Sequence, residues 1–184
     1  MPSRNRPQID PHIDLDGVLA DFDGAVQALG IDHGPDMNRS REHMSDAQRA
    51  AKDALYARIS GMDFFRHLPL MPGALDIWTL LTPHYPTILT AVPRFKDPDA
   101  FARAAEDKYR WVCDYIAPIP RARFVATTSR EKPNNMRANP GHLQLLIDDR
   151  KKNIEAWQAA GGTGVLHVEA SATIAELNRL LDRP

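Results

Sequence analysis

Short apolar segments alternate with amphipathic helical segments along most of this chain, and this alternation restricts the fold more than any other feature of the sequence. Segments typical of buried strands are residues 12–15, 86–92, 123–128, 143–149 and 164–168. Segments with helical periodicity are residues 44–60, 72–85, 97–117, 151–162 and 171–182. Because strands that alternate with helices form right-handed crossover units, the pattern predicts an α/β protein with a parallel sheet covered on both faces.

Local signals at the ends of the helical segments support their placement. Ser45 stands where an N-cap residue is favoured, and Pro72 fits the first turn of a helix. Asp97 or Asp99 marks the start of the long helix that follows. The helical segment 151–162 is expected to stop at its last two residues, Gly161 and Gly162.

The alternation is interrupted once, between the first strand segment and the helix that should follow it. Residues 24–68 differ in character and contain an Ala-rich stretch with helical periodicity. We therefore predict a core domain formed by residues 1–23 and 69–184, with a small helical insert at residues 24–68. The first ten residues are predicted to form a loose tail.

The composition is that of an ordinary globular protein, and it argues against several functional classes. Of the 184 residues, 43% are hydrophobic and 26% are charged, and the formal net charge is −1. This near-neutral balance disfavours general binding to nucleic acid or to an anionic membrane. No apolar run approaches the ~20 residues that span a bilayer, the polar N-terminus has no signal core, and Cys113 is the only cysteine. We expect a cytoplasmic protein without an internal disulfide.

Carboxylate and hydroxyl side chains recur directly after the strand segments. Asp14 and Asp16 stand in the turn at the end of the first segment, and Asp148 and Asp149 end the fourth. The other groups placed in this way are Thr90 and the loop at residues 128–132. In parallel sheets, ligands bind beyond the carboxyl ends of the strands, so we expect these groups to share one crevice.

A crevice with four carboxylates needs a cation, because like charges at close range oppose ionisation. Oxygen ligands without paired His or Cys favour Mg²⁺, which commonly shares a phosphate with the protein. A hydroxyl from Thr90 and a cation from Lys132 or Arg130 would bind phosphate oxygens, so the set predicts phosphoryl transfer. Asp14 is then suited to act as a nucleophile, and Asp16 as a general acid and base.

Five stretches occur in an order typical of a known family: IDLDGVLADFD (13–23), DFFRHLPLMPGALD (63–76), ILTA (88–91), EDKYRWVCDYIAP (106–118), and SREK (129–132) leading to LLIDDR (145–150). The first stretch resembles the first motif of the haloacid dehalogenase (HAD) superfamily of phosphatases. The second and fourth stretches favour the 5'(3')-deoxyribonucleotidases within it. The resemblance implies a three-layer, Rossmann-like parallel sheet of about five strands in the order 3-2-1-4-5, with a small helical cap inserted after strand one.

The resemblance also implies roles for individual residues. Asp14 would be the nucleophile and Asp16 the general acid and base. Thr90 would bind the phosphate, and Lys132 would neutralise phosphate and nucleophile. Mg²⁺ would be held by Asp14, the backbone carbonyl of Asp16 and a carboxylate of the pair 148–149.

Further matches and departures concern the substrate. Phe22 and Phe65 match positions that pack on the nucleoside in the family. The family usually follows its second-motif Thr with Ser and Pro, whereas this chain has Ala91 there, so one phosphate-binding hydroxyl is lost and Arg94 is a candidate to offset it. A longer loop after residue 132 leaves Arg137 as a rival for the cationic role. Residues 24–62 do not match the family convincingly, so the chemistry carries over better than the substrate.

The expected activity is Mg²⁺-dependent hydrolysis of a small phosphate monoester, with a nucleoside monophosphate favoured. No membrane partner and no stable nucleic-acid binding are expected, and a homodimer is compatible with the resemblance. Three alternatives stay open: a HAD phosphatase for another small metabolite, an enzyme acting on a polynucleotide end, and a HAD-like domain retained as a binding module. The near-zero net charge disfavours the second of these.

Overall fold

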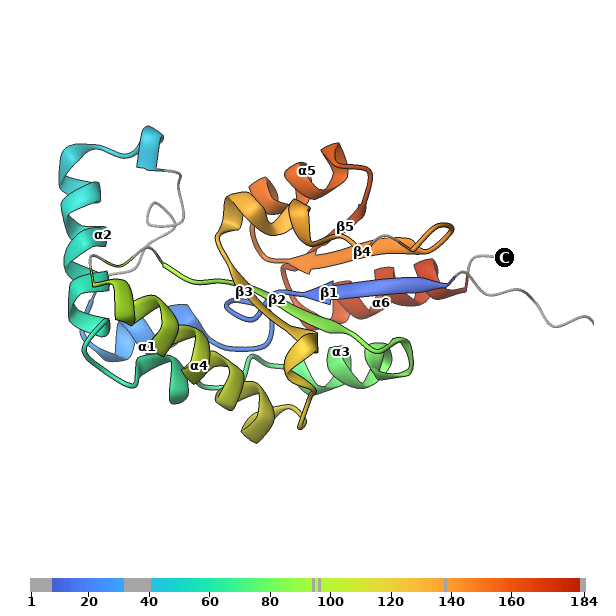
Figure 1. Ribbon diagram of the computed structural model, residues 1–184, viewed down its shortest axis with the longest axis horizontal. Helices are drawn as coiled ribbons and strands as arrows, with labels where there is room; N and C mark the ends of the chain where they lie inside the picture. Colours follow the sequence, from blue (N-terminus) through green and yellow to red (C-terminus); the bar gives the residue numbers. More distant parts are fainter. Residues whose placement is uncertain (1–7, 32–40, 94, 96, 138, 183–184) are drawn as a thin grey trace, which may run out of the picture.

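Five parallel strands form one sheet in the part of the chain that the structure describes, a computed structural model that covers residues 8–31, 41–93, 95, 97–137 and 139–182. Their order across the sheet is β3-β2-β1-β4-β5 (Figure 1). The strands are β1 (Ile9–Ile13), β2 (Thr87–Ala91), β3 (Phe124–Thr127), β4 (Leu143–Asp148) and β5 (Thr163–Leu166). The predicted α/β class and strand order are confirmed.

Helices connect the strands. The α-helices are α1 (Phe22–Ala28), α2 (Asp46–Ile59), α3 (Ala74–Leu81), α4 (Pro98–Tyr115), α5 (Lys151–Ala159) and α6 (Ala170–Leu181). Short 3-10 helices are η2 (Arg41–His43), η3 (Phe64–Arg66), η4 (Thr82–His84), η5 (Arg121–Arg123) and η6 (Ser129–Asn135). Ser45 caps α2, as the sequence predicted, and of the two candidates for the start of α4 it is Asp97 that caps the helix. Within the described residues, no helix combines the length and apolarity needed to cross a bilayer.

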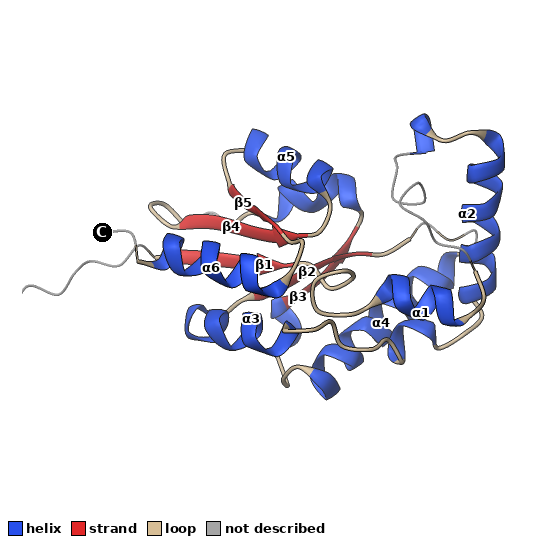
Figure 2. Ribbon diagram, turned by 180° about the vertical axis from the view of Figure 1, so that it is seen from behind, coloured by secondary structure: helices blue, strands red, loops and turns tan. Residues whose placement is uncertain are grey.

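Each face of the sheet has its own apolar cluster, because successive residues of a strand point to opposite faces. Ile13 and Ile147 belong to the larger cluster, which also contains residues of α3, α4 and α6. Leu146 belongs to a smaller cluster with Ile154 and Trp157 of α5. Helices α3 and α6 pack against each other along one face (Figure 2). Helices on both faces produce the three layers that the resemblance implied.

The first strand begins earlier than predicted. The strand expected at residues 12–15 and the loose tail through residue 10 are wrong, since β1 already includes Asp10 and Pro11. Aspartate and proline are both depleted in strands, which explains the error. The structure accommodates Asp10 because its carboxylate accepts hydrogen bonds from the side chains of Asn139 at 2.7 Å and Gln144 at 2.8 Å. It accommodates Pro11 because β2 lies beside only the last two residues of β1.

The helix predicted for residues 72–85 is shorter than expected. Gly73 is its N-cap, with a φ of 75°, so Pro72 precedes α3 instead of occupying its first turn. A Cβ on Gly73 would lie 2.3 Å from the Cβ of Ala170, so α3 and α6 approach too closely for a side chain there. Beyond α3 the chain tightens into the 3-10 helix η4.

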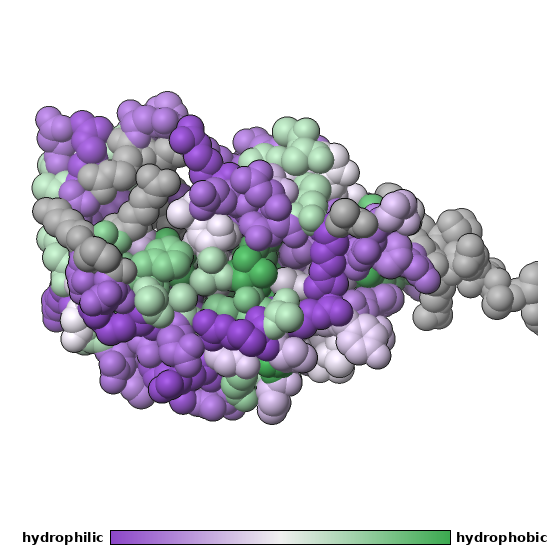
Figure 3. All heavy atoms as spheres, in the orientation of Figure 1, coloured by the Kyte–Doolittle hydropathy of each residue, from purple (hydrophilic) through white to green (hydrophobic). Residues whose placement is uncertain are grey.

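The segment between β1 and α3 lies beyond the carboxyl ends of the strands, on the left in Figure 1. It contains α1, α2 and η3, and η3 packs against α4 of the core. The indole of Trp111 on α4 donates a hydrogen bond to the carbonyl of Leu68 at 2.7 Å, which ties the returning chain to the core. On the face seen in Figure 3, apolar side chains gather near the middle, with hydrophilic side chains around them.

We expect the stability of the fold to fall between pH 6.5 and about 4 because of His12 on β1. Burial, with a contribution from the charge of Arg137, lowers the pKa of His12 from 6.5 to about 4. The unfolded chain therefore takes up a proton at a higher pH than the folded chain. Above pH 6.5 the neutral His12 makes its full contribution to the free energy of unfolding. This contribution is lost as the pH falls from 6.5 through about 4, and the loss amounts to roughly 3 kcal/mol.

Urea unfolding of the wild type and of His12→Gln across this pH range would measure the effect. The difference between the two unfolding free energies should change with pH below 6.5 and stay constant above it. A difference that is the same at every pH would show that His12 does not titrate abnormally in the folded protein.

Candidate active site

The turn after β1 places Asp14 at the edge of the sheet, beside the end of β4. The amide of Asp14 donates a hydrogen bond to the carbonyl of Ile147 at 2.9 Å, and the amide of Gly17 donates to the carbonyl of Ala20 at 2.8 Å. Gly17 has a φ of 76°, and a Cβ on it would lie 2.6 Å from Oδ2 of Asp149. Glycine is therefore needed both for the turn and for the close approach of Asp149.

Lys132 joins two carboxylates at this edge. Its Nζ lies 2.6 Å from Oδ2 of Asp14 and 2.6 Å from Oδ2 of Asp148, and its side chain is fully buried. Burial opposes its charge, but the two carboxylates outweigh this effect and raise the pKa of Lys132 above its usual value. The segment that carries Lys132 is the 3-10 helix η6, where the sequence predicted a loop at residues 128–132.

Asp148 is held from several sides. Besides Lys132, the side-chain amide of Asn153 donates to both of its oxygens at 2.9 Å, and the amide of Arg150 donates to Oδ1 at 2.9 Å. Burial and the nearby Asp14 raise the pKa of Asp148 to about 6, although Lys132 opposes them. Asp148 therefore fixes the lysine and the start of α5 in place.

Asp149 completes an acidic triad with Asp14 and Asp148, and the three can each offer an oxygen atom within 4.8 Å of the others. Burial, followed by the charges of Asp14 and Asp148, raises the pKa of Asp149 to about 8. A pKa this high shows that the positive charge around Asp149 does not balance the negative charge of the neighbouring carboxylates. The all-oxygen donor set and this shortage of positive charge fit a hard divalent cation.

Asp16 contacts a buried lysine that the sequence analysis did not identify. Nζ of Lys108, on α4, lies 2.6 Å from Oδ2 of Asp16, 3.0 Å from the hydroxyl of Thr90 and 2.9 Å from the carbonyl of Ala91. The same Nζ lies 4.8 Å from the ring centroid of Phe65. Burial raises the pKa of Asp16, Lys108 opposes this shift, and Asp14 adds to it.

The signal for Lys108 was present in the helical periodicity. Ala104, Ala105, Trp111 and Val112 are all buried, and Lys108 lies on the same face of α4. A lysine in the apolar stripe of an amphipathic helix is rarely buried unless it has a partner. The position thus indicated a buried charge, but only the folded structure shows that its partner is Asp16.

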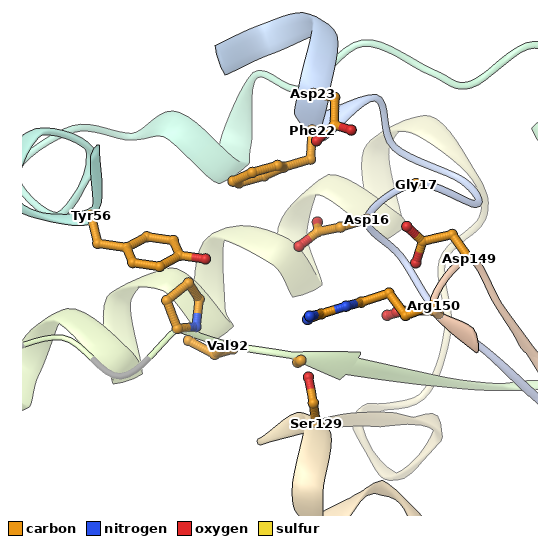
Figure 4. A pocket seen from close by; sticks show the side chains of 12 residues that line it. Asp16, Gly17, Phe22, Asp23, Tyr56, Val92, Ser129, Asp149 and Arg150 are labelled. Carbon is orange, nitrogen blue, oxygen red and sulfur yellow. The ribbon is translucent and has the colours of Figure 1, made fainter. Parts of the chain in front are cut away.

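A pocket opens next to these groups. Its lining residues are Asp14, Asp16, Gly17, Phe22, Asp23, Tyr56, Ala91, Val92, Pro93, Ser129, Asp149 and Arg150. Figure 4 shows the hydroxyl of Tyr56, the guanidinium of Arg150 and the hydroxyl of Ser129 directed towards its middle. None of these three was predicted as a site residue. Tyr56 comes from residues 24–62, where the sequence analysis found no convincing motif, and the other two depend on where η6 and α5 begin.

Only some of the predicted substrate-binding residues line the pocket. Phe22 and Ala91 line the pocket. Phe65 is only 2% exposed and stacks behind Phe22, with ring centroids 6.2 Å apart, instead of forming the pocket wall. Thr90 is also fully buried, with its hydroxyl accepting a hydrogen bond from Lys108. Arg94 lies outside the described residues.

The two rivals for the cationic role differ from Lys132 in their surroundings. Nη1 of Arg137 is 3.5 Å from Oδ1 of Asp10, and its other nitrogen contacts the hydroxyl of Thr87, so it sits at the amino ends of β1 and β2. Arg130 is exposed. Lys132 is the cation that the structure brings to the nucleophile candidate.

The arrangement suits attack on a phosphate ester. The carboxylate of Asp14 is held beside an ammonium group, and the carboxyl group of Asp16 has a raised pKa. The carboxylate of Asp149 can bind the same cation as that of Asp14. These are the elements of nucleophilic catalysis, general acid–base catalysis and metal binding, respectively.

Comparisons with known proteins identify the family to which this chain belongs. The model of the family described as 5' nucleotidase, deoxy (pyrimidine), cytosolic type C protein matches residues 9–176. A protein of Staphylococcus epidermidis provisionally named 5'(3')-deoxyribonucleotidase is 28% identical over 151 residues, which cover 79% of this chain and 76% of that protein. A protein of Staphylococcus aureus strain Mu50 with the same provisional name is 27% identical over 150 residues, with the same coverage of each chain.

Among solved structures, a haloacid dehalogenase-like hydrolase of Burkholderia xenovorans aligns with a TM-score of 0.49 and 15% identity, over 91% of this chain and 85% of that one. The family model extends from the first residue of β1 into α6 and so covers nearly all of the sheet and its helices. The chain belongs to the family of deoxy (pyrimidine), cytosolic type C 5' nucleotidases.

Proposed function

We propose that this protein hydrolyses nucleoside monophosphates in a Mg²⁺-dependent reaction that passes through an aspartyl phosphate on Asp14. The observation that carries the proposal is the position of the Asp14 carboxylate. It lies 2.6 Å from the Lys132 ammonium and lines the same pocket as Asp16 and Asp149. A nucleophile, a proton donor and a candidate metal ligand therefore reach one space.

The chain's own groups account for both halves of the reaction. A carboxylate oxygen of Asp14 bonds to phosphorus as the bond from phosphorus to the ester oxygen breaks, and Asp16 gives its proton to that oxygen. Water then attacks the phosphorus of the aspartyl phosphate, and Asp16 takes a proton from this water. Inorganic phosphate leaves and the Asp14 carboxylate is restored. Lys132 offsets the charge of Asp14 and limits its repulsion of the anionic substrate.

The acidic triad supports the proposal of a Mg²⁺ site. Asp14 and Asp149 would hold the ion, with Asp148 beside them and the main-chain carbonyl of Asp16 as a further oxygen ligand. When bound, the ion would neutralise phosphate charge and polarise the phosphorus–oxygen bonds.

The lining of the pocket supports a nucleotide as substrate. Phe22, at the start of α1, and Tyr56, from the insert, present aromatic rings to the pocket, and such rings are suited to stacking on a base (Figure 4). Ser129 and Arg150 supply a hydroxyl and a guanidinium suited to phosphate oxygens, and Ser129 offers the hydroxyl that Ala91 lacks.

Other predicted residues are proposed to act from behind the pocket wall. Phe65 would support the ring of Phe22. Thr90, which is buried below the surface of the pocket, would direct its hydroxyl towards the phosphate. A phosphate contact from Arg94 stays a prediction. We propose that residues 24–68 act as the cap that closes over the substrate, although α1 begins at Phe22 and so crosses the boundary drawn after residue 23. A cytoplasmic location is likewise proposed, in line with the description of the family.

Phosphate release from a panel of substrates tests the proposed function. Ribo- and deoxyribonucleoside monophosphates, with the phosphate at the 5' or 3' position, and sugar phosphates would be compared in Mg²⁺ and in EDTA. We expect Mg²⁺-dependent release that is fastest from the nucleoside monophosphates. Faster release from the sugar phosphates would favour a phosphatase for another metabolite. No release from any compound, with the folded protein in Mg²⁺, would contradict the proposed activity.

Mg²⁺ binding is expected to tighten as the pH rises from 6 to 8. Because Asp149 holds its proton up to a pH of about 8 without metal, binding below that pH must release the proton. The affinity should therefore fall by up to about tenfold for each pH unit below 8. Isothermal titration calorimetry in buffers of different ionisation enthalpy measures both the affinity and the released proton.

Asp149→Asn should remove this pH dependence and weaken Mg²⁺ binding by at least about tenfold. The same variant should unfold at a higher temperature than the wild type in EDTA at pH 8, because one repelling carboxylate is gone. Asp23→Asn is the matched control, since Asp23 lines the pocket but is not part of the triad. Unchanged Mg²⁺ affinity in Asp149→Asn would show that Asp149 does not hold the ion.

A further inference from the structure

We propose that Tyr56, supported by Phe95 behind it, sets the size of the base that the active site accepts, so that nucleotides with a single-ring base are hydrolysed faster than those with a double-ring base. The inference rests on the proposed function and assigns its base specificity to one side chain. It stands on the place of Tyr56 in the pocket, on a second cavity next to its ring, and on the contacts that hold the ring.

Tyr56 lies at the end of the pocket that is farthest from the reacting groups. In Figure 4 its ring stands on one side and Asp16 and Arg150 stand on the other, with the ring of Phe22 above the space between them. All four residues line the pocket. Because the phosphate is placed at the acidic end, the base of a bound nucleotide extends from there towards Tyr56.

The pocket is small, so the position of its end wall matters. Its volume is about 130 Å³, whereas pockets for small molecules commonly enclose roughly 300–1,000 Å³. A base that extends beyond the available space would overlap the ring of Tyr56, and its phosphate would then stay short of Asp14. The ring of Tyr56 therefore limits the length of the base.

A second cavity of about 340 Å³ lies next to Tyr56, on the side away from the reacting groups. Its lining includes Ile59 and Ser60 at the end of α2, and Phe95. The rings of Tyr56 and Phe95 meet edge to face, with their centroids 6.1 Å apart and their planes at 83°. Tyr56 lines the active-site pocket and Phe95 lines the second cavity, so this pair of rings separates the two spaces. Removing the Tyr56 ring would join them.

The ring of Tyr56 is held in place by its own helix and by Phe95. Leu55 and Ile59, one residue before and three residues after it in α2, are each 1% exposed and belong to the larger apolar cluster. Tyr56 itself packs against that cluster. A ring fixed in this way cannot move aside for a longer base, and exclusion by a fixed wall is an effective source of specificity.

The ratio of kcat/KM for deoxyuridine 5'-monophosphate to that for deoxyinosine 5'-monophosphate measures the effect in Mg²⁺. The two substrates share the sugar and the phosphate, and both bases present a keto group beside an N–H, so they differ chiefly in size. We expect a ratio of at least about 10 for the wild type. Tyr56→Ala should lower the ratio about tenfold, chiefly by raising kcat/KM for the inosine nucleotide. Tyr56→Phe keeps the ring and should keep the ratio within about twofold.

Arg58→Ala is the matched control, because Arg58 is exposed on the same helix and lines neither of the two cavities. Its ratio should equal that of the wild type. A wild-type ratio near 1 would overturn the inference, and so would an unchanged ratio in folded Tyr56→Ala.

Phe95→Ala keeps the test decisive if Tyr56→Ala does not fold. This variant removes the support behind Tyr56 without changing a residue that lines the active-site pocket. Its ratio should fall at least about threefold, and a folded Phe95→Ala protein with the wild-type ratio would contradict the proposed role of the pair. A wild type that releases no phosphate from any nucleoside monophosphate would instead contradict the proposed function.

Discussion

Replacing Asp14 with asparagine is expected to lower phosphate release by about 10⁴-fold or more while leaving the protein folded. The amide has nearly the same shape as the carboxylate but cannot form an aspartyl phosphate, and loss of a nucleophile costs several orders of magnitude in other covalent enzymes. The substitution leaves Lys132 its second partner, Asp148, at 2.6 Å. Phosphate release in Mg²⁺, together with thermal unfolding of the same sample, measures both parts of the expectation.

The control for this prediction is Asp76→Asn, which removes a carboxylate from the exposed first turn of α3. It should keep the activity and stability of the wild type. If Asp14→Asn retained activity within about tenfold of the wild type, the nucleophile would have to be another group, such as a water molecule.

Lys132→Met is expected to lose activity and to destabilise the fold strongly. The substitution leaves Asp14 and Asp148 close together, both nearly inaccessible to water, without the cation that separates them. Breaking a buried ion pair by removing one partner typically costs about 3–5 kcal/mol. For a chain of this length, that corresponds to a fall in Tm of roughly 10 °C. Thermal unfolding with and without Mg²⁺ measures it, and Mg²⁺ should restore part of the loss because it supplies positive charge at the same place.

Two further variants show whether the loss arises from the buried charges. Lys151→Met removes an exposed lysine whose Nζ is 3.6 Å from Glu155, and it should change the stability by less than about 1 kcal/mol. Lys132→Met combined with Asp148→Asn removes one carboxylate together with the lysine, so it should recover much of the stability but not the activity. A Lys132→Met protein as stable as the wild type would show that the three groups do not share charge as the geometry indicates.

The sequence predicted the parts of the site that follow directly from strand ends. Asp14, Asp16 and the pair at 148–149 come after apolar segments, and parallel strands bring their carboxyl ends to one edge. That rule, with the family resemblance, was sufficient for the α/β class, the strand order and the position of the carboxylates. It failed for β1, where Asp10 lies inside the strand because Asn139 and Gln144 satisfy its carboxylate.

What depended on contacts between distant segments was not predicted. The sequence could not decide whether Lys132 or Arg137 is the cation beside the nucleophile. In the structure η6 places Lys132 next to Asp14, whereas Arg137 contacts Asp10 at the opposite end of the strands. Lys108 is another case, since helical periodicity indicates a buried position but not the carboxylate that meets it. Tyr56 became part of the pocket only because the insert lies over the carboxyl ends of the strands.

The sequence by itself determined the alternation of strands and helices, the edge of the sheet where ligands bind, and the residue types available there. These follow from local periodicity and from the direction of the chain, which a sequence records. The tertiary structure alone decided which cation pairs with which carboxylate, because Lys108 and Asp16 are 92 residues apart in the sequence and yet Nζ of Lys108 lies 2.6 Å from Oδ2 of Asp16. Burial then sets the charge of each carboxyl group, and burial is a property of the folded chain as a whole.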